Sequence, residues 1–167
     1  MSQAVSLVEI AEHIEQWPLA VYIAESRYAF PLIEGVHLIG LSIAVGLLFI
    51  TDLRLAGVVL KRLPAVQVLH QLRPWVLGGF VVIFITGGLL FLASASSLVT
   101  SAVFAWKLLF IALAGINAAY FEFVIARRTE VRNGQTVLPL AARYAAIASL
   151  GLWSVVIVCG RMIPYLS

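Results

Sequence analysis

Four long apolar segments constrain the fold of this chain more than any other feature of its sequence. Each supplies about 20 mostly apolar residues, the length that a helix needs to cross the ~30 Å hydrocarbon layer of a membrane. Continuous apolar runs do not fit a membrane barrel, whose strands alternate lipid-facing and lumen-facing residues. The sequence therefore predicts an all-α integral membrane four-helix bundle. The predicted spans are Phe30 to Ile50, Trp75 to Ala93, Val103 to Ala126 and Leu138 to Gly160.

The low content of charged residues agrees with a surface that faces lipid. Of the 167 residues, 11% are charged and 62% are hydrophobic, whereas soluble domains carry roughly 25% charged residues. The four spans leave too little chain for a separate soluble domain. We therefore divide the chain into an N-terminal segment, residues 1–29, and a four-helix membrane domain, residues 30–167.

The basic residues predict how the chain is oriented. Basic residues beside short loops stay on the cytoplasmic side of a membrane. We therefore expect both termini and the second connection, residues 94–102, to lie outside, in a bacterial inner membrane. This topology accounts for the net charge of +3 and gives no reason to expect nucleic acid as a partner. Eight of the eleven lysines and arginines belong to the first and third connections and their flanks: Arg54, Lys61, Arg62, Arg73, Arg127, Arg128, Arg132 and Arg143.

The N-terminal segment has the pattern of a surface helix. Ser6 and Glu9 have the spacing of a capping box, in which both side chains satisfy free amides at a helix start. Apolar residues then recur on one helical face up to Trp17, and Pro18 ends the pattern. We expect residues 6–17 to form an amphipathic helix on the outer membrane surface.

Polar side chains inside the spans are the candidate site residues, because such groups are costly in a membrane and mark function. Glu34 and His37 share one helical face, so the carboxylate either orients the imidazole toward a metal or simply satisfies it. Lys107 lies at a similar depth in the third span, where it either meets His37 or extends to the lipid headgroups. Asn117, in the middle of that span, is placed to bond a neighbouring helix.

Other polar residues lie near the ends of the spans. Asp52 and Arg54, at the inner end of the first span, are expected to form an exposed or interfacial ion pair. His70 lies roughly 20 Å or more from His37 by helical rise, which excludes one iron held by both histidines. Met162 closes the fourth span on the outer side, and because thioether and imidazole suit copper(I), Met162 and His37 are the candidate metal ligands.

Several short stretches carry a resemblance to known families: HLIG at 37–40, DLRLAG at 52–57, TGGLLF at 86–91, FAWKL at 104–108 and AGIN at 114–117. Together they resemble an uncharacterised family of small bacterial four-helix membrane proteins. More distantly, their order is similar to the membrane domain of copper-resistance D proteins and to the four-helix protoporphyrinogen oxidases that bind haem b. The resemblance covers residues 26–125.

The resemblance implies a cofactor. In the oxidase group, a histidine in the first span and a lysine near a tryptophan in the third are signature positions, and His37 and Lys107 match them. This implies haem b in the outer half of the bundle near His37 and Lys107. With Glu34 and Asn117, the other polar residues singled out in these two spans, they form the set of candidate cofactor-binding residues. The second axial ligand stays open between Lys107, Met162 and none, and no reaction is implied.

Three functions are therefore expected in order. The first is a membrane redox-associated protein that binds haem b and takes part in electron transfer. The second is a cofactor-free membrane anchor, or docking subunit, whose outer surface holds a partner protein. The third is copper handling. The sequence leaves open whether the protein is an enzyme, and it identifies neither a substrate nor an electron donor.

Overall fold

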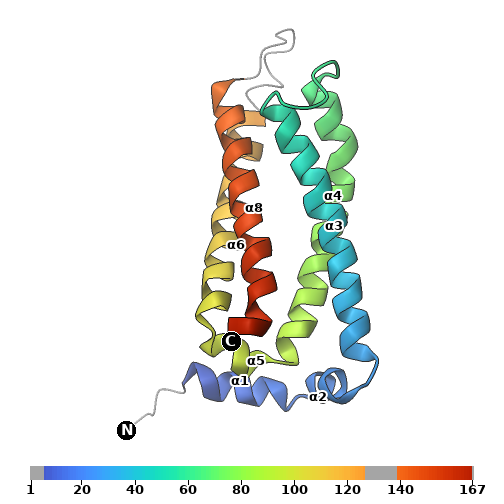
Figure 1. Ribbon diagram of the computed structural model, residues 1–167, viewed down its shortest axis with the longest axis vertical. Helices are drawn as coiled ribbons and strands as arrows, with labels where there is room; N and C mark the ends of the chain where they lie inside the picture. Colours follow the sequence, from blue (N-terminus) through green and yellow to red (C-terminus); the bar gives the residue numbers. More distant parts are fainter. Residues whose placement is uncertain (1–5, 127–138, 167) are drawn as a thin grey trace.

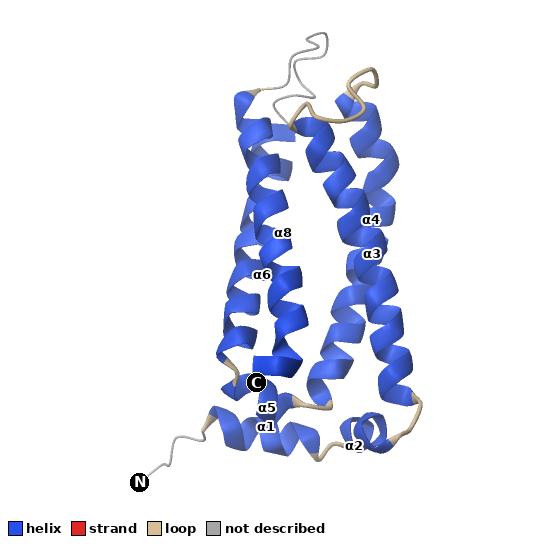
Figure 2. Ribbon diagram, in the orientation of Figure 1, coloured by secondary structure: helices blue, strands red, loops and turns tan. Residues whose placement is uncertain are grey.

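A computed structural model describes residues 6–126 and 139–166, which contain helices and no strands. Four helices run along the long axis of the molecule, with connections at the two ends (Figures 1 and 2). Three shorter helices lie across one end (Figure 1). The long helices are α3 (Ala29–Leu55), α4 (Ala65–Leu92), α6 (Ala102–Tyr120), which continues as the π-helical turn η1 (Phe121–Ala126), and α8 (Leu140–Leu166). The short helices are α1 (Leu7–Glu15), α2 (Pro18–Glu25) and α5 (Ala95–Thr100).

The predicted four-helix membrane bundle is confirmed. Each long helix is long and apolar enough to cross a membrane, and only 11% to 17% of its most apolar 18-residue window is buried inside the protein. Large apolar side chains such as Leu32, Ile39 and Phe84 are more than 60% exposed. Because this much apolar surface needs an apolar surrounding, the chain is a multi-pass membrane protein.

The long helices pair into two hairpins, α3 with α4 and α6 with α8, and α3 also contacts α8. Small residues permit the close approach of α3 and α4, as is usual between membrane helices. Ala44 is fully buried, and a Cβ atom built on Gly79 would lie 2.8 Å from the Ala44 Cβ atom. In the other hairpin, the Asn117 side-chain amide donates to the Ala145 carbonyl over 3.0 Å, which confirms the predicted interhelical bond.

The end of the bundle that carries α1, α2, α5 and the C-terminal end of α8 is called the terminal end (Figure 1). The capping box of α1 is confirmed: the Glu9 amide donates to Ser6 Oγ and the Ser6 amide donates to the Glu9 carboxylate. The helix α1 packs against α5. At the start of α5, the Ser96 amide and hydroxyl both donate to the Glu15 carboxylate at 2.9 Å. The free amide at the start of α5 is thus satisfied by a residue 81 positions away. Because this capping partner is distant in the chain, the residues 94–102 by themselves did not indicate a helix.

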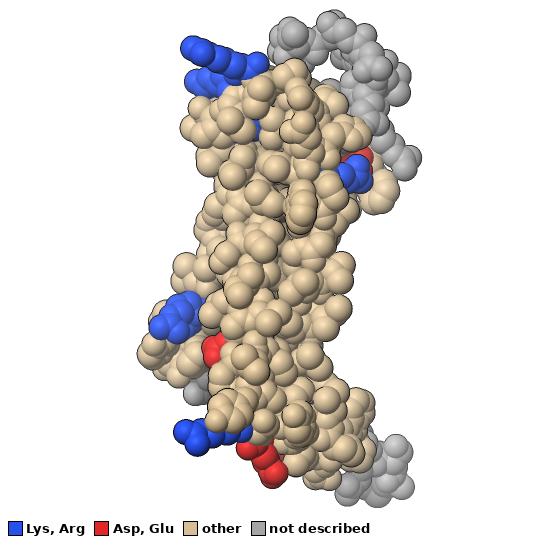
Figure 3. All heavy atoms as spheres, turned by 90° about the vertical axis from the view of Figure 1, so that its right-hand side faces the viewer, with Lys and Arg blue, Asp and Glu red and all other residues tan. Residues whose placement is uncertain are grey.

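The opposite end is called the loop end, and it differs from the prediction in one helix boundary. The second span was predicted to begin at Trp75, whereas one continuous helix runs from Ala65 to Leu92 with Pro74 inside it. Arg127, Arg128 and Arg132, which support the predicted orientation, lie outside the described residues. On the face shown in Figure 3, charged side chains gather toward the two ends and leave an uncharged middle. The direction in which the bundle crosses the membrane stays a prediction.

Candidate functional site

His37 lies between α3 and α4, where its ring is bound by a threonine of the neighbouring helix. The distance between His37 Nδ1 and Thr86 Oγ1 is 2.8 Å. The Thr86 hydroxyl itself donates to the Val82 carbonyl, one turn earlier in α4, over 2.7 Å. A hydroxyl has one hydrogen and two acceptor lone pairs. Because that hydrogen is used on Val82, the Thr86 oxygen accepts from His37.

This hydrogen-bond chain fixes the tautomer of the histidine. With the Thr86 hydrogen directed at Val82, we assign the proton of the neutral imidazole to Nδ1 of His37. A neutral imidazole with its proton on Nδ1 has a lone pair on Nε2. A histidine that donates from one ring nitrogen to a fixed acceptor is the arrangement found in metal-ligating histidines.

Gly87 leaves room for the ring. A Cβ atom at this position would lie 3.2 Å from His37 Cε1, which is tighter than an ordinary van der Waals contact. Thr86 thus binds Nδ1 of the imidazole, and Gly87, which has no side chain, leaves room for the ring beside α4. Both belong to the TGGLLF stretch of α4.

Lys107 approaches the same region from the other hairpin. It lies in the second turn of α6 and is partly buried, and a Cβ atom on Gly160 of α8 would lie 3.7 Å from its Nζ atom. Its charge interacts electrostatically with His37 and with Cys159. The structure therefore places the lysine side chain beside α8 and within electrostatic range of the histidine.

The remaining candidates lie apart from the His37 ring. Glu34 is exposed and influences His37 only through its charge, and the orienting role considered for it is filled by Thr86. Met162 is 37% exposed near the end of α8. Asn117 lines a cavity nearer the loop end, where its amide is bonded to Ala145. Within residues 6–126 and 139–166, no group of three His, Cys, Asp or Glu residues is placed to hold a metal ion.

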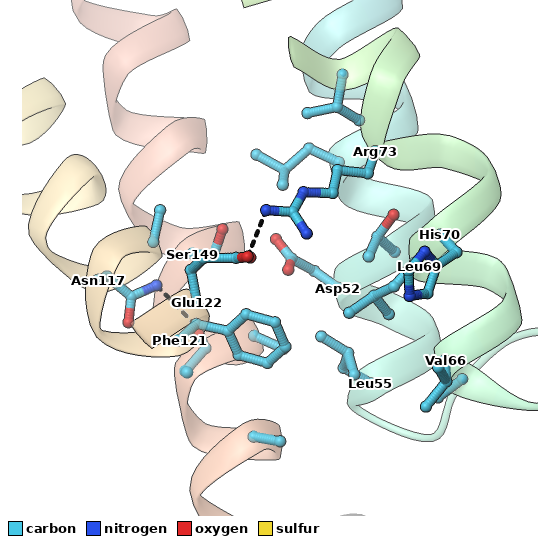
Figure 4. Close-up of a pocket in the computed structure, with 18 residues that line it drawn as sticks. Asp52, Leu55, Val66, Leu69, His70, Arg73, Asn117, Phe121, Glu122 and Ser149 are labelled. Carbon is cyan, nitrogen blue, oxygen red and sulfur yellow. Dashed lines mark hydrogen bonds and ion pairs between the residues drawn. The ribbon is translucent and has the colours of Figure 1, made fainter. Parts of the chain in front are cut away.

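A second polar region lies nearer the loop end, around a cavity of about 200 Å³ between the two hairpins (Figure 4). Aromatic contacts separate it from His37: the rings of Phe80 and Trp153 lie 4.9 Å apart, and both residues lie between the two polar regions in their helices. The cavity walls are mainly apolar. Its polar lining comes from all four long helices and includes Thr51, Asp52, His70, Arg73, Asn117, Glu122 and Ser149.

The predicted ion pair between Asp52 and Arg54 is wrong. Asp52 is only 5% exposed and its carboxyl group lines the cavity, whereas the Arg54 guanidinium donates twice to the Leu63 carbonyl. Residues two apart in a helix do not face each other, so the two side chains leave α3 in different directions. Arg54 holds the first connection, and Asp52 faces the interior.

An ion pair crosses the cavity region. Arg73 of α4 donates to the Glu122 carboxylate of η1, which connects the two hairpins (Figure 4). Beside it, the Ser149 hydroxyl of α8 is a hydrogen-bonding neighbour of the Asp52 carboxyl group. Oδ2 of Asp52 is buried and has no hydrogen-bond partner. Glu122 lies in a π-helical turn, a feature that often occurs at functional sites.

Two features of the candidate sites were not predicted from the sequence. A threonine in an apolar span usually bonds to its own helix, so nothing marked Thr86 as the partner of His37, although it lies in a stretch that carries the resemblance. Asp52 carried a signal, because a carboxylate one turn inside a span is costly. Its burial could not be foreseen without knowing which face of α3 meets α8.

Comparisons with known proteins place the chain in a family but supply no activity. Residues 22–166 match the model of a family of unknown function (DUF6644). No curated protein and no solved structure matches the chain. Any functional assignment therefore has to come from the residues themselves.

Proposed function

We propose that this chain, a member of the family of unknown function DUF6644, is a membrane redox-associated protein. We propose that it holds haem b in the terminal half of its bundle through Nε2 of His37. One observation carries the proposal. His37 Nδ1 lies 2.8 Å from Thr86 Oγ1, whose hydrogen is directed at the Val82 carbonyl, and this contact supports a proton on Nδ1 and a lone pair on Nε2 for a ligand. Thr86 would thus set the tautomer and the orientation of the His37 ring, which is the role of the hydrogen-bond partner of a metal-ligating histidine.

The donor set fits haem better than a bare metal ion. A porphyrin supplies four nitrogen ligands itself, so one histidine can be enough to hold its iron. Copper held by side chains alone needs more ligands, and within the described ranges no group of three His, Cys, Asp or Glu residues is placed to hold it. Met162, the proposed partner of His37 for copper(I), is 37% exposed near the end of α8.

Lys107 supports the same location. Its ammonium group lies beside Gly160 of α8, 3.7 Å from where a Cβ atom would be, and acts on His37 electrostatically. In this position it either offers a positive charge to a haem propionate or, when neutral, a ligand. Haem b supplies a one-electron couple, while the protein supplies binding and the surrounding charge. We further propose that the terminal end faces outward from a bacterial inner membrane, as the basic residues predict.

The test is an absorption spectrum of the chain purified in detergent after expression with haem precursor. We expect a Soret band that disappears in His37→Ala and persists in His70→Ala, because His70 lines the cavity on the other side of the Phe80 and Trp153 rings. Both variants should be recovered in the membrane at the level of the parent.

The outcomes separate the rival functions. A spectrum without a Soret band would rule out haem and leave the membrane anchor that docks a partner protein. Bound copper near one per chain, lost in His37→Ala and Met162→Ala, would instead establish copper handling.

A further inference from the structure

The cavity nearer the loop end plays no part in the proposed haem site. It is bounded by α3, α4, η1, α6 and α8, and the Phe80 and Trp153 rings lie between it and His37. A buried carboxylate with an unpaired oxygen, a connecting ion pair and apolar walls therefore occur together without an assigned role (Figure 4).

Asp52 is the central observation. Asp52 is only 5% exposed, and Oδ2 of its carboxyl group has no hydrogen-bond partner. A buried charged group without a partner is costly. The carboxylate of Asp52 accepts hydrogen bonds but, when ionised, has none to give. A hydrogen-bond donor that enters the cavity would satisfy it.

The charges that line the cavity favour a cation. The lining holds two carboxyl side chains, Asp52 and Glu122, and one guanidinium group, that of Arg73. Arg73 is already bound to Glu122. Asp52 is therefore the carboxyl group with an oxygen left unpaired, and a cation that enters the cavity would stabilise its ionised form.

The walls decide the kind of cation. Most of the lining residues are apolar, and the Asn117 side chain donates one hydrogen bond to the Ala145 carbonyl. Divalent metal ions require several oxygen ligands together. One of the two carboxylates here, Glu122, is already bound to Arg73, and no group of three His, Cys, Asp or Glu residues is placed to hold a metal within the described ranges. A volume of about 200 Å³ lies below the range of ordinary drug-sized pockets, so the ligand is small. The apolar walls are Leu48, Leu55, Val66, Leu69, Val76 and Phe121.

We propose that this cavity binds a small organic ammonium ion, with the charged group at the Asp52 carboxylate and an apolar body against Leu69 and Phe121. The same chemistry is available from a free amine or from the ethanolamine headgroup of a lipid. Val66, a lining residue that is 46% exposed, places one wall at the protein surface, where either source could enter.

The experiment is calorimetric titration of the full chain in a non-ionic detergent. Benzylamine and methylamine serve as cationic probes, and benzyl alcohol serves as the neutral match of benzylamine. We expect benzylamine to bind more tightly than both. Asp52→Asn should weaken its binding by at least about tenfold, because a charge-assisted hydrogen bond is lost. Glu25→Gln, the same change at an exposed carboxylate at the terminal end, should leave the affinity unchanged.

A second variant keeps the test valid if Asp52→Asn fails to fold. Val66→Phe adds bulk to a wall that is partly exposed, so the side chain can relax outward, and the carboxylate stays in place. It should weaken benzylamine more than methylamine. Binding of benzyl alcohol as tight as that of benzylamine, equal affinities of Asp52→Asn and Glu25→Gln, or no binding of either amine would each overturn the proposal.

An additional arm identifies the source of the ammonium group. Phosphatidylethanolamine added to the detergent should compete with benzylamine if a lipid headgroup is the natural occupant. Without competition, the site takes free amines. The haem spectrum of Asp52→Asn should match that of the parent, so this proposal and the haem site can fail independently.

Discussion

Gly79 lies where α3 and α4 approach most closely among the described glycine positions, and replacing it with alanine should separate these helices. The added Cβ atom would lie 2.8 Å from Ala44 Cβ and 3.0 Å from the Ala44 backbone nitrogen and Cα. Ordinary contact begins at 3.4 Å, so the helices must move apart by roughly 0.6 Å. The neighbouring atoms include backbone, and a rotamer change of a side chain cannot relieve the clash.

The magnitude follows from two opposing effects. Overpacking of a close contact costs about 1–3 kcal/mol, whereas glycine to alanine in a helix favours the helix by up to about 1 kcal/mol. Gly78 provides the matched control, because it is exposed and no atom lies within 4 Å of its added Cβ. The helix term is shared by both variants, so the difference between Gly79→Ala and Gly78→Ala should equal the packing cost of about 1–3 kcal/mol.

The assay is reversible unfolding of each variant by titration with a denaturing detergent. Gly79→Ala should unfold earlier than the parent, and Gly78→Ala should unfold at the same point or later. The separation of α3 and α4 should also lengthen the 2.8 Å bond between His37 and Thr86, so haem occupancy should fall in the first variant alone. Equal unfolding curves for the two alanine variants would refute the close approach of α3 and α4 at Ala44.

Three further predictions concern the proposed haem site and the orientation of the chain. Thr86→Val should weaken haem binding by about tenfold or more, because the acceptor that fixes the His37 tautomer is removed; Thr86→Ser should retain most of it, and equal spectra for the two variants would contradict the tautomer assignment. Lys107→Arg should insert normally but shift the haem spectrum, because arginine cannot lose its proton and has a planar head; Lys107→Met should do so more strongly, and parental spectra in both would return Lys107 to a headgroup-reaching role. In a Cys159→Ser background, a cysteine at Ser97 should react with an impermeant reagent added outside, whereas one at Asn133, in a segment outside the described residues, should react only after the membrane is opened; the reverse pattern would invert the topology.

The presence and order of the four spans could be predicted from the sequence because the bilayer acts on composition alone. In hydrocarbon every backbone amide and carbonyl must be satisfied within the segment, so a long apolar run such as residues 30–50 has to be a helix. The capping box at Ser6 and Glu9 was equally readable, because its partners lie three residues apart. His37 and Lys107 could be singled out for the same kind of reason, since a polar group in a span is conspicuous.

The contacts between the spans were decided only by the tertiary structure. Lipid tails are as apolar as leucine, so hydrophobicity does not select which faces of membrane helices meet. The partner of His37, 49 positions away at Thr86, follows from how α3 packs on α4. In the same way, the packing of α3 against α8 and of α4 beside η1 turned Asp52 from an expected surface residue into the buried carboxylate of a cavity. The local sequence determines the depth at which a polar group lies in the membrane. The packing of neighbouring helices, which no single span encodes, determines what that group faces.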